Sequence, residues 1–241
     1  MITSARSRDD SVTTITLDRP ERRNALSTTL LTQLLAYVES ACADERNRAI
    51  VLTASGRAFC AGADLTDPPD AQFPALFQKV LTTIMEAPLP VIARVAGHVR
   101  AGGIGLIAAC DVAICSDDVT FGFSEVRVGV VPAFVAVLAR RLMGARAVQE
   151  LILTGRPFAA SEALGAGLLT SVVEPTQLDS AVEGVLDEFG KADADSVGRA
   201  KRLLRDLDGR TEADGFLFVA NMSAAQFGSP TAKSLQGRSH A

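Results

Sequence analysis

The order in which strand-like and helix-like segments follow one another constrains the fold of this chain more than any other feature. Through the first 130 residues, short segments rich in β-branched residues alternate with segments of helical periodicity. From Pro132 onward nearly every apolar pattern is helical, apart from a strand-like segment at 170–173. Because strand–helix alternation is typical of partly parallel sheets, we expect an α/β core followed by a helical C-terminal region.

The same patterns predict where the elements lie. Strands are expected at 12–17, 49–53, 90–96, 112–115 and 119–122. Helices are expected from the cap Ser27 to about 43, and at 73–85, 102–110, 133–142, 145–153, 161–166, 176–189, 195–207 and 211–227. The segment 54–74 is rich in Gly and Pro, so we expect a loop there.

Composition excludes several classes of function. The 241 residues are enough for one large domain, and a net charge of −4 lacks the basic excess of nucleic-acid-binding proteins. No apolar segment is long enough to span a membrane, and the N-terminus lacks the apolar core of a secretory signal. The four cysteines form no Cys-x-x-Cys pair and there are two histidines, so we expect a cytoplasmic protein without a metal site.

The most unusual segment is RAGGIGLIAACD, which begins at Arg100 shortly after an expected strand. Within it, residues 103–108 match the G-x-G-x-x-A fingerprint of dinucleotide-binding folds. The match is weak because residues 98–101 separate the strand from the glycines, and the next strand ends without the acid that would bind a ribose. Considered alone, so many small residues most simply indicate that a helix packs closely on a sheet.

A second segment of small residues, GRAFCAGADL at 56–65, also follows an expected strand. Each of the two segments could expose a backbone N–H group. Two such groups aimed at one point form an oxyanion hole, which stabilises a carbonyl oxygen as it gains negative charge. A helix that begins near Gly102 would add the positive end of its dipole. Together the segments favour an oxyanion hole over a nucleotide-binding loop.

The chain resembles the crotonase (enoyl-CoA hydratase/isomerase) superfamily. The blocks ITLDRPERRNALS, AFCAGADL, GHVRAGGIGLIAACD and FGFSEVRVGVVP occur in the order and spacing of that superfamily, and LTGRPFAASEALGAGLLTSVVE looks like its next block. The resemblance spans roughly residues 10–175, and a compatible helical region continues to about 227. It is highly specific for the superfamily and much less specific for the reaction.

The resemblance implies a spiral of ββα units with C-terminal trimerisation helices. Residues 1–190 would form the core with its acyl-CoA site, and residues 191–241 the helical oligomerisation region and tail. The implied assembly is a homotrimer or a dimer of trimers. The implied partner is an acyl-CoA substrate, with no nucleic acid, no membrane, no metal and no cofactor besides the coenzyme A of the substrate.

Positions in the motifs also imply individual roles. The oxyanion donors would be the backbone N–H groups of Ala63 and Gly102, and the catalytic acid or base would be Glu125. Substrate contacts are implied for Arg22, Arg23, Ala25, Ala61, Asp64, Leu65 and Thr66. The two arginines would lie near the CoA phosphates, although a solvated loop explains them equally well.

One departure from the family pattern bears on the reaction. Hydratases of the family use two glutamates, and the position of the first is occupied here by Gly105. The other, Glu125, has the apolar neighbours Phe121, Phe123, Val126 and Val128, which are expected to be buried. A lone Glu is more often exposed to solvent, but in apolar surroundings its pKa should be raised, which suits proton transfer at neutral pH.

A single carboxyl leaves three functions open. Hydration of a 2-enoyl-CoA ranks first, if one carboxyl can both activate water and protonate Cα. Isomerisation of a 3-enoyl-CoA to a 2-enoyl-CoA ranks close behind, because it needs only one base. A non-catalytic acyl-CoA-binding protein ranks third.

The pocket for the acyl chain and the assembly surface are also predicted. The helix 73–85 and the segment 133–138 should line the acyl chain, and Val130, Val131 and Phe134 indicate an apolar pocket. The helix 211–227 carries Phe216, Phe218, Val219 and Met222, more apolar surface than a monomer normally exposes. The polar tail 228–241 is expected to be loosely ordered. Because the tail is short, we also expect CoA binding to be weakened.

Overall fold

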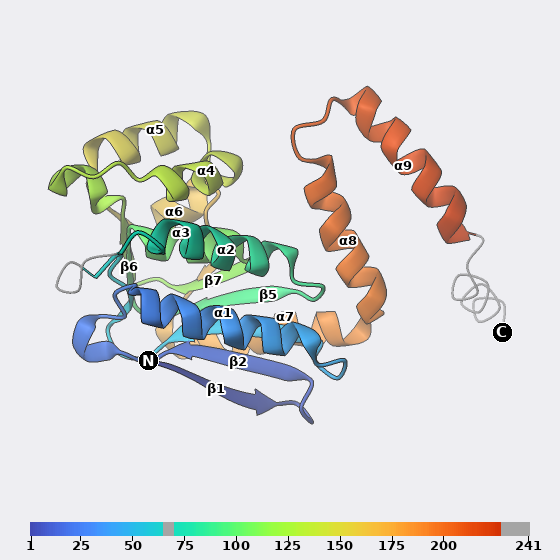
Figure 1. The fold of residues 1–241 in the computed structure, drawn as a ribbon, viewed down its shortest axis with the longest axis horizontal. Helices are drawn as coiled ribbons and strands as arrows, with labels where there is room; N and C mark the ends of the chain where they lie inside the picture. Colours follow the sequence, from blue (N-terminus) through green and yellow to red (C-terminus); the bar gives the residue numbers. More distant parts are fainter. Residues whose placement is uncertain (65–69, 228–241) are drawn as a thin grey trace. The chain divides into compact units, whose positions relative to one another are not determined.

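Figure 1 shows the computed structural model of the chain. It describes the backbone of residues 1–64 and 70–227 and the side chains of residues 1–64 and 70–220. The predicted substrate contacts Leu65 and Thr66, the tail after residue 227 and the side chain of Met222 therefore lie outside the described residues. The chain divides into two units, Met1–Lys201 and Arg202–Ala241, and the predicted functional division at residue 190 stays a prediction.

The larger sheet of the first unit has six strands in the order β1-β2-β3-β5-β7-β10. They are β1 (Ile2–Ser7), β2 (Val12–Leu17), β3 (Ala49–Ala54), β5 (Val91–Val95), β7 (Val112–Ser116) and β10 (Ser171–Val173). Only β1 and β2 pair antiparallel, and the other neighbours are parallel. The expected α/β core with partly parallel strands is therefore confirmed.

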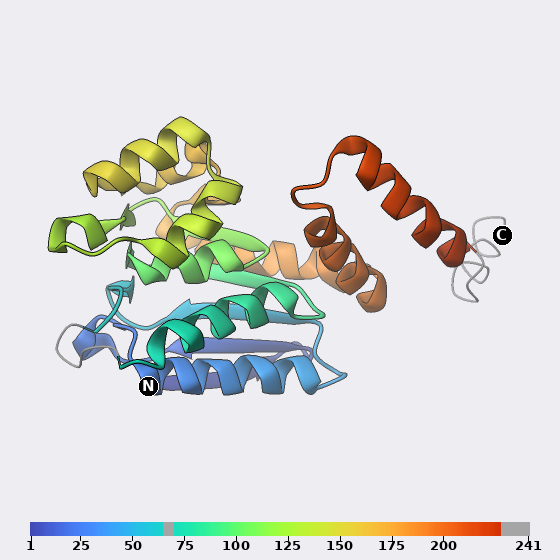
Figure 2. The same ribbon diagram turned by 45° about the horizontal axis from the view of Figure 1, so that its top comes forward.

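Helices cover both faces of this sheet, as Figures 1 and 2 show. On one face lie α1 (Thr28–Ala43), α2 (Phe73–Glu86) and α3 (Gly102–Ala109), and on the other lies α7 (Leu178–Lys191). Successive residues of β3 point to opposite faces, so Ile50 and Leu52 join the larger apolar cluster while Val51 packs with the α7 side. Because both faces are covered, β3 is apolar nearly throughout.

A second, smaller sheet was not predicted. Its strands are β4 (Ala58–Cys60), β6 (His98–Arg100), β8 (Thr120–Gly122) and β9 (Pro157–Ala159), in that spatial order. Strands β4, β6 and β8 are parallel, and β9 pairs antiparallel with β8. The prediction of a loop over 54–74 is thus wrong at β4. Strand β8 coincides with the strand expected at 119–122. Strands β4, β6 and β9 were not predicted, because each contains at most one β-branched residue, and neighbouring strands stabilise them instead.

The remaining chain is largely helical, as expected. It contains α4 (Ala133–Leu142), α5 (Ala145–Thr154), α6 (Ala160–Ala166), α8 (Ala194–Leu207) and α9 (Glu212–Phe227). Each predicted helix is present, with ends shifted by a residue or two. Three short 3-10 helices, η1 (Pro20–Arg22), η2 (Ser124–Val128) and η3 (Pro175–Gln177), and the strand β1 were not predicted. None of the described helices is long and apolar enough to cross a membrane.

Candidate functional site

The three predicted catalytic positions follow the carboxyl ends of three strands of the small sheet. Ala63 follows β4, Gly102 follows β6, and Glu125 follows β8. Parallel pairing aligns the ends of these strands, because β6 lies between β4 and β8 and Arg100 is in register with Gly122. The carboxyl ends of parallel strands are where α/β proteins commonly bind ligands. The topology therefore places all three positions at the same end of the strands of the small sheet.

The loop after β4 leaves the N–H group of Ala63 available. Leu26 donates its N–H to the carbonyl of Gly62 at 2.7 Å and accepts from the N–H of Asp64 at 2.9 Å. These two bonds pair Leu26 with Ala63 as an isolated parallel bridge, in which the N–H of Ala63 points away from Leu26. Within the described part of the chain, no hydrogen bond uses the Ala63 N–H.

The loops after β4 and β6 touch each other. Gly62 has φ +91°, and a Cβ at this position would lie 2.7 Å from the Cβ of Ala101. A larger residue would therefore both strain the backbone and collide with the second loop. This contact explains why small residues gather in both segments, and it brings the residues after Gly62 and Ala101 close together.

The loop after β6 is strained just before its predicted donor. Ala101 has φ +48° and ψ −122°, a conformation that costs a non-glycine residue about 1–3 kcal/mol. The next residue, Gly102, begins α3, and the first N–H groups of a helix have no acceptor within the helix. Among the described residues, no hydrogen bond uses the Gly102 N–H. The positive end of the α3 dipole lies at the same place.

Glu125 lies in η2 in partly apolar surroundings. Its side chain is half-buried, and the Oε2 atom is buried without a hydrogen-bond partner among the described residues. Burial raises the pKa of Glu125 above its usual value, as the sequence predicts. Of the predicted apolar neighbours, Phe121 and Phe123 are fully buried, but Val128 is 62% exposed, so that part of the prediction is wrong.

The position of Gly105 is enclosed by apolar side chains. A Cβ built there would lie 3.3 Å from Phe77 Cζ, 3.5 Å from Val135 Cγ2 and 3.7 Å from Leu81 Cδ2. The family position of the first glutamate therefore faces a hydrocarbon surface in this protein. The predicted lining of the acyl pocket by 73–85 is consistent with these contacts. Val131, however, is 78% exposed and Val130 is also exposed, so in the single chain they lie on the surface, contrary to the prediction.

The side chain of Asp64 is turned toward the protein. It is 3% exposed and forms an ion pair with Arg19 at 2.9 Å. The backbone N–H of Arg19 donates to Oδ1 of Asn24, whose Nδ2 donates to the carbonyls of Ser55 and Ala58. The Arg19–Asp64 ion pair ties the segment after β4 to the loop before α1, and the Asn24 bonds tie the same loop to Ser55 and to the beginning of β4. Sequence reasoning missed Arg19 and Asn24, although both lie in the first motif block.

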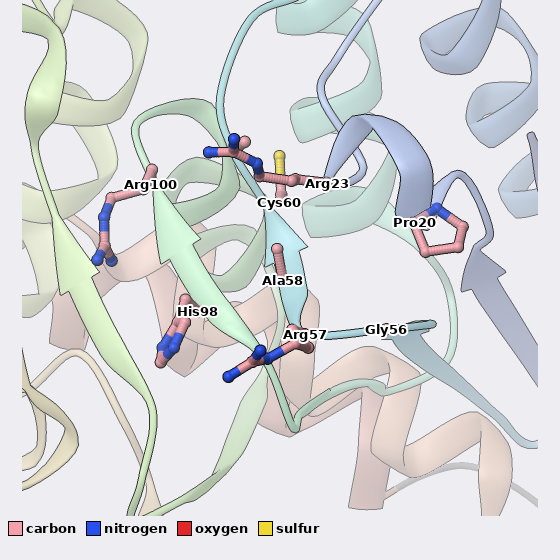
Figure 3. Close-up of a pocket in the computed structure, with 9 residues that line it drawn as sticks. Pro20, Arg23, Gly56, Arg57, Ala58, Cys60, His98 and Arg100 are labelled. Carbon is pink, nitrogen blue, oxygen red and sulfur yellow. The ribbon is translucent and has the colours of Figure 1, made fainter.

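A basic pocket of about 480 Å³ lies beside β4 and β6 (Figure 3). It is lined by Pro20, Arg23, Gly56, Arg57, Ala58, Cys60, Ala61, His98 and Arg100. The lining includes three arginines and a histidine and no acidic residue. Predicted contacts Arg23 and Ala61 are among the lining residues, whereas Arg22 is exposed on η1 and Ala25 is buried nearby.

Arg100 is the most constrained cation of the basic pocket. It is half-buried and donates to the carbonyls of Val99 and Thr120 and to the Thr120 hydroxyl, at 2.8, 2.7 and 2.9 Å. No carboxylate of the described residues pairs with it, and burial lowers its pKa. Sequence reasoning missed Arg57, His98 and Arg100, because only the pairing of β4 with β6 brings them together.

Comparisons with known proteins agree with this architecture. The family model described as enoyl-CoA hydratase/isomerase matches residues 7–235. A crystal structure of an enoyl-CoA hydratase from Mycobacterium smegmatis superposes with a TM-score of 0.92 at 33% identity, covering 99% of this chain and 94% of that one.

Two curated proteins of Rattus norvegicus show how far relatives differ in name. Enoyl-CoA hydratase domain-containing protein 3, mitochondrial, is 33% identical over 86% of this chain and 72% of its own length. Delta(3,5)-Delta(2,4)-dienoyl-CoA isomerase, mitochondrial, is 32% identical over 88% of this chain and 72% of its own length. Because both are named as mitochondrial, the cytoplasmic location stays a prediction.

Proposed function

The chain belongs to the enoyl-CoA hydratase/isomerase family, and within it we propose that Glu125 is the single acid–base group acting on an acyl-CoA thioester held by the N–H groups of Ala63 and Gly102. The contact between Gly62 and Ala101 is the observation that carries this proposal. It brings together two loops whose next residues each have an N–H group without an acceptor among the described residues. A thioester oxygen accepting from both would be stabilised as it gains enolate charge.

Glu125 would then move the proton at the carbon next to the thioester carbonyl. Negative charge that develops on Cα is delocalised onto the oxygen in the hole, which makes a Cα–H acidic enough for a carboxylate to remove. A raised pKa suits Glu125 both to take a proton near neutral pH and to return it. This proton transfer requires no metal and no cofactor besides the coenzyme A of the substrate.

The surroundings of Gly105 favour isomerisation of a 3-enoyl-CoA to a 2-enoyl-CoA. In that reaction the Glu125 carboxylate takes a proton from C2, the double bond shifts to C2–C3, and the carboxylic acid returns the proton to C4. One carboxyl completes the cycle. Phe77, Val135 and Leu81 offer no polar atom to hold water on the Gly105 side. The name of the rat dienoyl-CoA isomerase is compatible with this chemistry.

Hydration of a 2-enoyl-CoA, which the sequence ranks first, is the second candidate. The M. smegmatis protein is named as an enoyl-CoA hydratase and the other rat relative is named for its enoyl-CoA hydratase domain, which favours this reaction. In hydration Glu125 would take a proton from water and deliver it to Cα while hydroxide adds to Cβ. That step needs another group to hold the water, and the three atoms nearest to a Cβ at Gly105 are all hydrocarbon atoms.

The basic pocket supports coenzyme A as the carrier of the acyl group. Its three arginines have no acidic neighbour in the lining, so an anion would relieve their mutual repulsion. Ala61 connects the pocket to the predicted hole, since it lines the pocket and lies two positions before Ala63. The phosphates of coenzyme A would lie beside Arg23, Arg57 and Arg100.

The test follows the ultraviolet absorbance of the conjugated thioester with both classes of substrate. Isomerisation predicts that absorbance appears when the protein is given a 3-enoyl-CoA, and that the Glu125→Gln variant abolishes this. Loss of absorbance from a 2-enoyl-CoA, with no reaction of the 3-enoyl-CoA, would instead identify a hydratase. Tight binding of both without any reaction would support the non-catalytic alternative.

A further inference from the structure

Three phenylalanines form an aromatic cluster over the beginning of α3. The rings of Phe73 and Phe77 stack with centroids 6.0 Å apart, and Phe134 meets the edge of Phe77 at 5.8 Å. The cluster joins α2 to α4. Phe77 at its centre is 3% exposed, whereas Phe73 and Phe134 are half-buried.

Phe77 contacts the two glycine positions that share one face of α3. A Cβ at Gly102 would lie 3.4 Å from Phe77 Cζ, and a Cβ at Gly105 would lie 3.3 Å from the same atom. Residues three apart lie on one face of a helix, so the ring covers the surface from the first turn of α3 to the second. A Cβ at either position would just touch the ring, so a side chain larger than a methyl group would displace the ring from the helix.

This arrangement places Phe77 where an acyl chain must pass. In the proposed function, on which this inference rests, the thioester oxygen accepts from the Gly102 N–H. The first acyl carbons then lie beside the beginning of α3, next to the face on which the two glycines carry no side chain. Beyond that face lie Phe77, Val135 and Leu81, all apolar and close-packed.

We propose that the Phe77 ring is the end wall of the acyl pocket and limits this enzyme to short acyl chains. The space that a longer chain would need is occupied by the ring itself. Because Phe73 and Phe134 hold the ring from both sides, it cannot turn away without disturbing α2 and α4. The specificity residue therefore comes from α2, outside the motif blocks.

The test measures binding of saturated acyl-CoAs of increasing length by calorimetry, so no reaction is needed. Each buried methylene should improve Kd about fourfold until the chain reaches the wall. For the wild-type protein we expect this improvement to stop at a short chain. For Phe77→Ala it should continue over several further methylenes, which raises the long-to-short affinity ratio by about tenfold or more.

Phe158→Ala is the matched control. Phe158 has the same 3% exposure as Phe77 but belongs to β9, where it stacks on Phe121 and Phe123. Its loss should remove as much core volume while leaving the length at which affinity stops rising unchanged. The affinity ratio compares two ligands on one sample, so partial unfolding cancels. Phe77→Leu provides a milder second variant, with a smaller extension expected.

The outcomes separate this inference from the proposed function. Wild-type protein that binds no acyl-CoA of any length contradicts the proposed function. Binding whose dependence on length is the same in Phe77→Ala, Phe158→Ala and wild type overturns the role of Phe77 alone. Wild-type affinity that rises steadily to long chains also overturns it.

Discussion

Gly62→Ala perturbs the contact on which the proposed oxyanion hole depends. A residue with a side chain at φ +91° costs about 1–2 kcal/mol. The added Cβ would lie 2.7 Å from that of Ala101, and overpacking of this kind costs about 1–3 kcal/mol. The free energy of unfolding should therefore fall by about 2–5 kcal/mol. Relief of the clash must move the loop that carries Ala63 or the loop that carries Gly102.

Catalysis should suffer beyond the loss of stability. A displacement of about 1 Å at a catalytic group can lower the rate about a hundredfold, so we expect kcat per folded molecule to fall by about that factor. Gly167→Ala is the matched control, because Gly167 has φ +97° and a Cβ there would lie 2.5 Å from the carbonyl oxygen of Leu142. Gly167 ends α6 and lines neither the predicted hole nor the basic pocket.

The assay combines urea denaturation with turnover at saturating substrate. Both variants should lose similar stability, but only Gly62→Ala should lose turnover after correction for the folded fraction. Equal turnover per folded molecule in the two variants would refute the argument that the Gly62–Ala101 contact aligns the donors.

Four further predictions concern three other parts of the molecule. Because burial raises the pKa of Glu125, the decrease of kcat/KM with falling pH should have its midpoint above the usual pKa of a glutamate. Because the pKa of Glu125 is higher in the folded than in the unfolded protein, its ionisation destabilises the fold once pH rises past the pKa of the unfolded state. Glu125→Gln should therefore be more stable than wild type at neutral pH but not at low pH, as melting temperatures measured at several pH values can check. Replacing Arg57 or Arg100 by Gln should raise KM for acyl-CoA about tenfold but not for the matching N-acetylcysteamine thioester, which lacks the phosphates. Phe216 and Leu217 on α9 are 74% and 71% exposed, so light scattering should give a trimer or a dimer of trimers, and a monomer mass would contradict the predicted role of α9.

The sequence was sufficient for the long elements of the fold. A helix such as α1 repeats apolar residues along one face over several turns, and Ser27 caps it by accepting from the Leu30 N–H, so both periodicity and cap are visible in the sequence. Strands β4, β6 and β9 have three residues each and at most one β-branched side chain per strand, so they lack the two successive β-branched residues, at 119–120, by which the equally short β8 could be predicted. They form because neighbouring strands and loops satisfy their backbone groups.

Most of the candidate site residues were predicted because they lie in motif blocks. Ala63, Gly102 and Glu125 do, and the small sheet places them after the carboxyl ends of adjacent strands. Arg23 of the basic pocket was predicted from its motif block, and the helix 73–85, which contains Phe77, was predicted to line the acyl chain. The convergence of Arg57, His98 and Arg100 was not predicted, because only the pairing of β4 with β6 brings them together. Val130 and Val131 were predicted to line a pocket but are exposed, because an apolar residue in a sequence does not reveal whether it faces a pocket or the surface.

The most direct test of the account is exchange of the α-protons of a short saturated acyl-CoA with deuterated solvent. Such a ligand can be neither hydrated nor isomerised, so exchange reports only on a base acting at Cα of a thioester whose oxygen is held. Wild-type protein should catalyse exchange, and Glu125→Gln should reduce the rate about a hundred- to ten-thousandfold while binding the ligand equally well. Exchange that continues at the wild-type rate in Glu125→Gln, or its absence from wild-type protein that binds the ligand, would contradict the assignment of Glu125 as the acid–base group.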